Sequence, residues 1–218
     1  CHKMNLLSST ISKLARMRLW RIENWSNHPV AAQREVLQDL VTAAQYTEFG
    51  RKYNFSKLFS LKEFKKNVPI HEYNDLKPYI QRMMDGEENI LWNTPVTWFA
   101  KSSGTTSDKS KFIPISQESL QDNHFKASKD LLSNYYKNFP SSDLLTGKGL
   151  VVGGSHQISK VNDEIQYGDL SAVLMQNSPF WGQWIRTPEL SVALLDEWEE
   201  KIEKLAQVTA EENVTSLA

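Results

Sequence analysis

Cysteine is almost absent from this sequence, which rules out two common ways of stabilising a fold. The 218 residues contain a single cysteine, Cys1, so neither an intrachain disulfide nor a cysteine-based zinc site can form. A chain without disulfides suits a reducing compartment. We therefore expect a cytoplasmic protein.

Surplus charge and long apolar runs are missing as well. The formal net charge is −1 at pH 7, so the chain as a whole has no electrostatic attraction for nucleic acid or for an anionic membrane. No segment approaches the roughly 18 consecutive apolar residues that a membrane span requires. We expect neither a nucleic-acid partner nor a membrane partner, and any anion-binding site has to be local.

The composition is otherwise that of a folded protein, and its first part is rich in helices. Apolar residues make up 40% and charged residues 23% of the sequence. Apolar periodicity predicts helices over residues 6–27, 30–49 and 75–85. The first of these carries a basic face, formed by Lys13, Arg16, Arg18 and Arg21. Such a helix can lie on a membrane surface, but a solvated face is commoner, and we favour that interpretation.

Local signals predict where several helices begin and end. Ser60 and Glu63 have the spacing of a capping box, in which each side chain satisfies a backbone donor at the helix start. They predict a further short helix. Gly50 is expected to end the second helix and Gly86 the third, since glycine favours the position that follows a helix.

Strand-like segments begin at Val96. β-branched and aromatic residues predict strands at 96–100, 111–115, 149–153 and 172–175, with a long helix at 117–137 among them. Strands and helices in alternation indicate an α/β fold of mixed α+β character. We therefore divide the chain into a helical N-terminal region, 1–95, and the start of an α/β domain, 96–218. A β-rich segment begins just before the last residue, so we expect this domain to continue beyond residue 218.

One polar loop between the first two predicted strands has the composition of a phosphate-binding site. It runs from Ser102 to Lys111 and reads SSGTTSDKSK. Its glycine allows a sharp turn close to a ligand, and successive backbone N–H groups can form an anion-binding concavity. Hydroxyl groups donate to phosphate oxygens, and lysine supplies positive charge. The alternative is a flexible, solvated hairpin.

The spacing of this loop excludes two better-known phosphate motifs. The nucleoside-triphosphatase loop requires Gly-x-x-x-x-Gly-Lys-[Ser/Thr], and Lys109 stands here in place of the second glycine. The segment from Gly147 to Gly153 has the wrong glycine spacing for a dinucleotide fingerprint, and it leads into a predicted strand rather than a helix. Neither motif is present.

The loop resembles the first nucleotide motif of the auxin-responsive acyl-acid amido synthetases, bacterial members in particular, which are a branch of the acyl-adenylate-forming superfamily. The likeness rests on the SSGTT core, on WFAK before it and on FIPIS after it, and it extends over nearly the whole chain. It implies that the chain is the N-terminal part of the large domain of an adenylate-forming enzyme. It also implies a phosphate-binding loop that consists of Ser102, Ser103, Gly104, Thr105 and Thr106, with Lys111 as the catalytic cation. Asp108 departs from the family, which often has glycine there, and would place a carboxylate near the phosphates.

The reaction implied by this resemblance has two steps and uses ATP with Mg²⁺. A carboxylic acid attacks ATP to form an acyl adenylate, and an amine, such as that of an amino acid, then displaces AMP. The family's second and third nucleotide motifs do not occur in the 218 residues, so this portion alone is expected to be inactive. Two alternatives stay open: an acyl-CoA ligase, which differs in the second nucleophile, and a non-catalytic interaction module, for which the seven tryptophans argue.

Overall fold

Two compact units interleave along the chain. The computed structural model describes residues 6–102, 110–152, 158–179, 182, 184–193, 195 and 197–217. The first unit contains residues 1–22, 118–159 and 168–218, and the second contains residues 23–117 and 160–167. The linear division between residues 95 and 96, expected from the sequence, stays a prediction.

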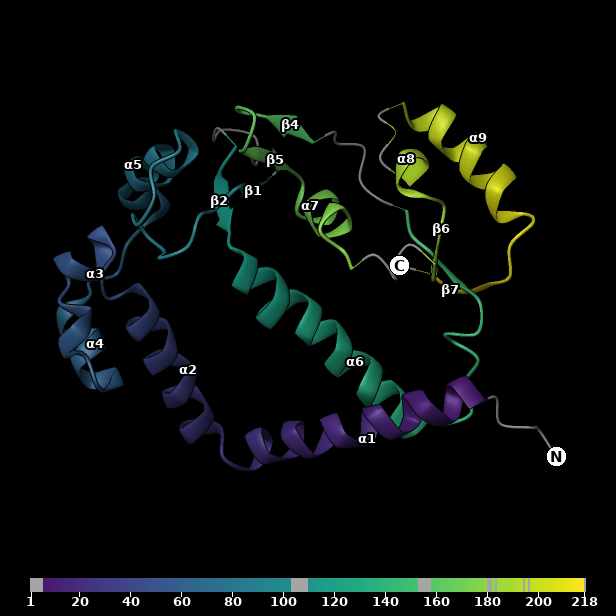
Figure 1. Cartoon of the computed structure of the whole chain (residues 1–218), viewed down its shortest axis with the longest axis horizontal. Coiled ribbons are helices and arrows are strands. Elements are labelled where there is room, and N and C mark those ends of the chain that lie inside the picture. The colour runs from purple at the N-terminus through teal and green to yellow at the C-terminus, as the bar shows by residue number, and fades with distance from the viewer. Residues whose placement is uncertain are drawn as a thin grey trace. The chain divides into compact units, whose positions relative to one another are not determined.

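The second unit begins with a series of mostly short helices (Figure 1). They are α2 (Pro29–Ala44), α3 (Glu48–Lys52), the 3-10 helix η1 (Phe55–Lys57), α4 (Leu61–Asn67) and α5 (Tyr73–Met84). The predicted capping signal is confirmed, because Ser60 Oγ accepts a hydrogen bond from the Glu63 N–H at 3.2 Å at the start of α4. The Glu63 carboxylate in turn accepts the Phe59 N–H at 2.9 Å.

Gly50 does not end a helix as the sequence predicted. Helix α2 already stops at Ala44, and Gly50 lies buried inside α3. A Cβ atom at Gly50 would lie 2.0 Å from the Ala44 carbonyl oxygen, so the close approach of two backbone segments requires glycine there. Gly86, by contrast, follows α5 with a φ of +96°, and the predicted glycine terminus is confirmed.

Two apolar clusters form the core of the second unit. One joins the inner face of α5 to strand β1 (Trp98–Lys101) and contains Ile80, Met83, Met84, Ile90, Val96, Phe99 and Ile165. The other brings α2 together with η1 and contains Val41, Ala44, Phe55 and Leu58. Because β1 leads directly into the polar loop, the first cluster also positions the base of that loop.

Strand β1 belongs to a four-stranded sheet with the strand order β2-β1-β5-β4. The other strands are β2 (Phe112–Ile115), β4 (Ser159–Lys160) and β5 (Gln166–Gly168). β1 and β2 run antiparallel, with Lys101 opposite Phe112. β2 is an edge strand, and it accommodates Pro114 because an edge residue need not donate a hydrogen bond to a neighbouring strand.

The first unit combines helices with a small parallel sheet. Its helices are the part of α1 (Leu6–Asn27) up to Ile22, the π-helical segment η2 (Ser119–His124), α6 (Phe125–Asn138), α7 (Leu170–Gln176), α8 (Leu190–Ala193) and α9 (Trp198–Thr209). Its sheet has the order β6-β3-β7, with β3 at Lys148–Leu150, β6 at Arg186–Thr187 and β7 at Val214–Leu217. Both pairs of strands are parallel.

The segment 172–175, predicted as a strand, is part of helix α7. Ala172, Val173 and Met175 are buried there. A short apolar run fits a buried helix as well as a buried strand, so periodicity alone could not separate them. The mixed α/β class is nevertheless confirmed by the helices and the two sheets. Among the helices in the described ranges, none is long and apolar enough to cross a membrane.

Candidate functional site

Strands β1 and β2 lie side by side (Figure 1), and the two residues that border the polar loop, Ser102 and Lys111, are hydrogen-bonded to each other. The Ser102 N–H donates to the Lys111 carbonyl oxygen at 2.9 Å, and the Lys111 N–H donates to Ser102 Oγ at 3.3 Å. These bonds extend the ladder by one pair beyond Lys101 and Phe112. Ser102 and Lys111 are therefore held together at the base of the loop.

The two strands that carry the loop base are each anchored to the rest of the unit. In β1, Phe99 is 0% exposed and belongs to the same apolar cluster as the inner face of α5. In β2, the Phe112 N–H donates to the Tyr73 hydroxyl at 2.9 Å, and Tyr73 is the first residue of α5. A site on elements positioned by the core holds its geometry better than one on loops alone.

Two lysines flank the loop base, and each lies over an aromatic ring. Lys111 Nζ is 5.5 Å from the centroid of the Tyr73 ring, and Lys101 Nζ is 5.8 Å from that of Tyr167. Phe112 packs edge-on against Tyr167, with 5.1 Å between ring centroids and 86° between ring planes. The aromatic rings thus orient two ammonium groups at the base of the loop.

Both ammonium groups are accessible to an anion. The two lysine side chains are exposed, and neither forms an ion pair with a carboxylate in the part of the chain that the structure describes. A cation–π contact at an exposed site is worth about 0.5–1 kcal/mol, whereas a hydrogen bond between charged groups is worth about 1.5–3 kcal/mol. A phosphate oxygen can therefore compete with the ring for either lysine.

Of the residues predicted to bind phosphate, the structure describes Ser102 and Lys111 and brings them together. The other calls lie outside the described residues: Ser103, Gly104, Thr105 and Thr106, together with Asp108. Their role stays a prediction. The contributions of Tyr73 and Tyr167 were missed, because Tyr73 meets Phe112 across 39 positions of sequence and no local pattern indicates such a contact.

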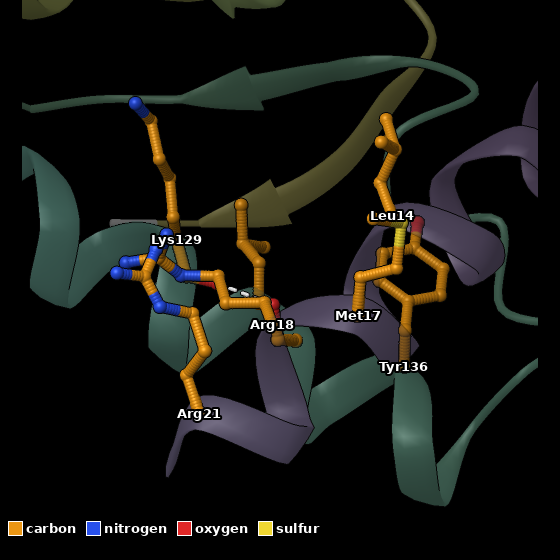
Figure 2. Close-up of a pocket in the computed structure, with 8 residues that line it drawn as sticks. Leu14, Met17, Arg18, Arg21, Lys129 and Tyr136 are labelled. Atoms are coloured by element: carbon orange, nitrogen blue, oxygen red, sulfur yellow. Dashed lines mark hydrogen bonds between the residues drawn. The ribbon is translucent and has the colours of Figure 1, made fainter.

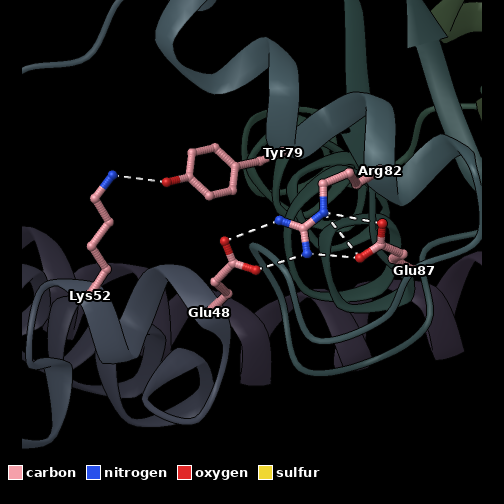
Figure 3. A network of polar contacts seen from close by, with 5 residues as sticks. All are labelled: Glu48, Lys52, Tyr79, Arg82 and Glu87. Atoms are coloured by element: carbon pink, nitrogen blue, oxygen red, sulfur yellow. Dashed lines mark hydrogen bonds and ion pairs between the residues drawn. The ribbon is translucent and has the colours of Figure 1, made fainter.

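A second polar cluster joins α3 to α5 in the same unit (Figure 3). Arg82 Nη1 donates to Glu48 at 3.0 Å, and Arg82 Nε and Nη2 donate to Glu87, the shortest of these bonds being 2.7 Å. Lys52 donates to the Tyr79 hydroxyl at 2.9 Å. These helices border a hollow of about 620 Å³, which is lined by Glu48, Lys52, Pro69, Ile70, His71, Asp75, Pro78, Tyr79 and Arg82.

In this second cluster Arg82 pairs with two carboxylates, whereas Lys52 donates to a neutral tyrosine hydroxyl. The hydrogen bonds from Arg82 hold the pKa of Glu87 below its ordinary value. The hydrogen bonds to Glu87, followed by those to Glu48, raise the pKa of Arg82. The hydrogen bond to Tyr79 raises the pKa of Lys52. We interpret the cluster as a structural connection between α3 and α5 rather than as a ligand site.

No metal site is formed within the described ranges. There, no group of three or more His, Cys, Asp or Glu side chains is placed to hold a metal ion. The loop base offers cations and hydroxyl donors, which suit an anion such as a polyphosphate. The residues that the structure describes at this site therefore fit a polyphosphate group, which ATP, the cofactor expected from the sequence, would supply.

Comparison with known proteins identifies relatives over most of the chain. The model of the GH3 family N-terminal domain matches residues 18–218. The indole-3-acetic acid-amido synthetase GH3.2 of Arabidopsis thaliana is 34% identical over 116 residues, which cover 53% of this chain and 21% of that protein. The jasmonoyl-L-amino acid synthetase JAR4 of Nicotiana attenuata is 31% identical over 150 residues, which cover 68% of this chain and 25% of that protein.

Solved structures agree with the fold. A GH3.15 acyl acid amido synthetase matches with a TM-score of 0.70 at 22% identity, over 84% of this chain and 32% of its own. The structure of AtGH3.15 acyl acid amido synthetase in complex with 2,4-DB matches with a TM-score of 0.64 at 25% identity, over 74% of this chain and 28% of its own. The chain thus spans about a fifth to a third of the length of these proteins.

Proposed function

The chain belongs to the GH3 family, and we propose that it supplies the triphosphate-binding loop of an ATP-dependent acyl-acid amido synthetase. The observation that carries the proposal is the loop base, where Ser102 and Lys111 are hydrogen-bonded to each other and two lysine ammonium groups are oriented by aromatic rings. Matching relatives are named as amide-forming synthetases. This supports an amine, rather than coenzyme A, as the acyl acceptor.

The proposed reaction proceeds through an acyl adenylate. In the first step a carboxylate oxygen of the acid attacks the α-phosphorus of ATP, the bond from that phosphorus to the bridging oxygen breaks, and pyrophosphate leaves. In the second step the amine attacks the acyl carbon, the bond to the adenylate oxygen breaks, AMP leaves, and the nitrogen loses a proton. Negative charge builds up on the leaving pyrophosphate in the first step, so oriented cations and donors lower that barrier.

Each described residue of the loop base has a distinct role in this proposal. The Lys111 ammonium leaves the Tyr73 ring to donate to a phosphate oxygen, and Lys101 supplies a second positive charge nearby. Ser102 closes the loop through its backbone and its hydroxyl. Residues 103–106 are proposed to donate backbone N–H and hydroxyl groups to the phosphates. Mg²⁺, also part of the proposal, binds phosphate oxygens with few protein ligands.

Isotope exchange tests the adenylation step. We expect the protein expressed from its complete reading frame to exchange pyrophosphate into ATP when it is given a suitable carboxylic acid. Indole-3-acetic acid, jasmonic acid and 2,4-DB are the first candidates, by analogy with the named relatives. Lys111→Ala should reduce the exchange rate by about ten- to a hundredfold. Gly104→Val should reduce it further, because a β-branched side chain restricts the turn and blocks the ligand's approach.

A matched control removes the same charge elsewhere. Lys65 is exposed at the end of α4, so Lys65→Ala should leave exchange unchanged. Wild-type exchange in both Lys111→Ala and Gly104→Val, with folding confirmed by circular dichroism, would refute the assignment of the loop. The acceptor is identified separately by supplying amino acids or coenzyme A and analysing the products by mass spectrometry. Cell fractionation tests the cytoplasmic location, which is also a proposal.

A further inference from the structure

A groove between α1 and α6 in the first unit combines an apolar wall with a cluster of positive charge (Figure 2). Its volume is about 470 Å³, within the range of roughly 300–1,000 Å³ that is usual for small-molecule sites. The residues that line it are Leu14, Met17, Arg18 and Arg21 of α1 and Lys129, Leu132, Ser133 and Tyr136 of α6. None of them belongs to the phosphate loop or to its base.

Positive charge gathers at one end of the groove. Figure 2 shows the guanidinium groups of Arg18 and Arg21 close together, with Lys129 reaching the same side from α6. Arg18 is held in place, because it forms an ion pair with Asp130 and its Nη2 donates to the Lys126 carbonyl oxygen at 2.9 Å. Among the side chains that the structure describes, three cations against one carboxylate give this end a formal net charge of +2.

Two of these cations are not neutralised within the described ranges. Arg21 and Lys129 are exposed, and neither forms an ion pair with a carboxylate there. The fixed Arg18 and the two unpaired groups therefore leave positive charge directed at one side of the hollow. An anion placed there would receive hydrogen bonds from charged donors on two helices.

The other end of the groove is apolar and open to water. Leu14 is 63% exposed and Met17 is 73% exposed, while Tyr136, at 3%, closes the hollow beneath them. These three side chains lie together in Figure 2, on the side away from Arg21. Covering apolar surface stabilises a complex by about 25 cal/mol per Å². A ligand with an apolar chain would bury surface that the protein leaves exposed.

We propose that this groove binds a single-chain phosphomonoester, with its alkyl chain along Leu14, Met17 and Leu132 and its phosphate between Arg21 and Lys129. The charge of the site selects the head group. A phosphomonoester carries about −1.5 to −2 at pH 7 and balances the cationic end, whereas a carboxylate leaves one positive charge unmatched. Guanidinium groups also match phosphate oxygens in a bidentate geometry. The site goes beyond the proposed adenylation, since binding requires neither ATP nor the phosphate loop.

Calorimetric titration without ATP tests this proposal. Decyl phosphate, kept below its micellar concentration, should bind saturably with one molecule per chain. Decanoate should bind about tenfold more weakly because one charged hydrogen bond is lost, and inorganic phosphate should bind more weakly still because it buries no apolar surface. Affinity for decyl phosphate should fall as salt is added, since the cations are exposed.

Variants of exposed residues separate binding from folding. Arg21→Gln combined with Lys129→Gln should weaken binding of decyl phosphate by about a hundredfold, and Met17→Gln by a few-fold. The matched control, Lys57→Gln with Lys65→Gln, removes two exposed charges from the second unit and should change nothing.

Three results would each overturn the proposal. They are no saturable binding of decyl phosphate, unchanged affinity in the double variant at positions 21 and 129, and association with phosphatidic acid vesicles without binding of the monomeric ligand. Because these readouts contain no ATP, their failure leaves the proposed adenylation untouched, and failure of pyrophosphate exchange leaves the groove untouched.

Discussion

The second unit contains two polar regions that differ in whether their charged side chains are paired with opposite charges. In the cluster between α3 and α5, Arg82 is hydrogen-bonded to both Glu48 and Glu87, so opposite charges satisfy one another. At the loop base, Lys101 and Lys111 face aromatic rings instead of carboxylates. Paired charges connect two helices, whereas the two lysines leave positive charge for a ligand. The contrast separates residues that maintain the fold from residues proposed to bind ATP.

The largest effect is expected on stability, from substitution of Gly50 in α3, a residue that maintains the fold. Gly50→Ala should lower the free energy of unfolding by about 3 kcal/mol, because the new Cβ atom would clash with the Ala44 carbonyl oxygen, 2.0 Å away. Urea denaturation measures the change. If no backbone atom lay close to Gly50, alanine, which favours a helix interior more than glycine does, would have little effect or would stabilise the protein. Unchanged or increased stability would therefore contradict the packing account.

Lys101→Ala is expected to have the next largest effect, and on ligand binding rather than on folding. The side chain is exposed, and its ammonium group lies over the Tyr167 ring. Loss of one positive charge near the triphosphate should weaken ATP binding about tenfold. Urea denaturation should show a change below about 0.5 kcal/mol, as is usual for surface substitutions. A large loss of stability with unchanged ATP affinity would show instead that Lys101 maintains the fold and does not bind ATP.

Tyr73→Phe should have a moderate effect on stability, because Tyr73 belongs to α5 and its hydroxyl contacts the strand that carries the loop base. The substitution removes the hydroxyl that accepts the Phe112 N–H at 2.9 Å but keeps the ring under Lys111. One lost hydrogen bond should lower the free energy of unfolding by about 1 kcal/mol. Amide hydrogen exchange at Phe112 should become faster, since its donor loses its partner. Unchanged exchange at that amide would show that the hydroxyl does not anchor β2.

The smallest effect is expected from Arg82→Gln, and it should depend on pH. Arg82 holds the pKa of Glu87 below its ordinary value, so the stabilisation is present above the unfolded-state pKa and is lost as pH falls through the folded-state pKa. The wild type should therefore have a slightly higher Tm than the variant at pH 7, and the difference should shrink below about pH 4. These groups are exposed, so the difference stays small. A Tm difference that persists unchanged in acid would contradict this assignment.

Local chemistry in the sequence was sufficient to predict much of this architecture. The capping pattern at Ser60 and Glu63 and the glycine at Gly86 both act within one helical turn, and both are confirmed. Strands β1 and β2 were predicted from β-branched and aromatic residues. Gly50 was misjudged because the atom that requires glycine, the Ala44 carbonyl oxygen, belongs to a different helix.

The candidate site was predictable only where its residues are close in sequence. The composition of the loop and the family resemblance pointed to Ser102 and Lys111, and the structure joins them by hydrogen bonds. The rings that orient the lysines come from α5 and β5, which folding brings to the loop base. Helix propensity, alternation and turn signals carry no information on such contacts, because they describe only neighbours along the chain.

The distinction between residues that bind ATP and residues that maintain the fold is tested most directly by thermal unfolding with and without ATP. The proteins to compare are the wild type, Lys111→Ala and Arg82→Gln. A ligand that binds only the folded state raises Tm, and the increase grows with the logarithm of the ratio of ligand concentration to Kd. The account predicts that Lys111→Ala keeps the wild-type Tm without ATP but loses most of the increase caused by ATP. Arg82→Gln should start from a slightly lower Tm and keep the full increase. An undiminished increase in Lys111→Ala, or its loss in Arg82→Gln alone, would contradict the account.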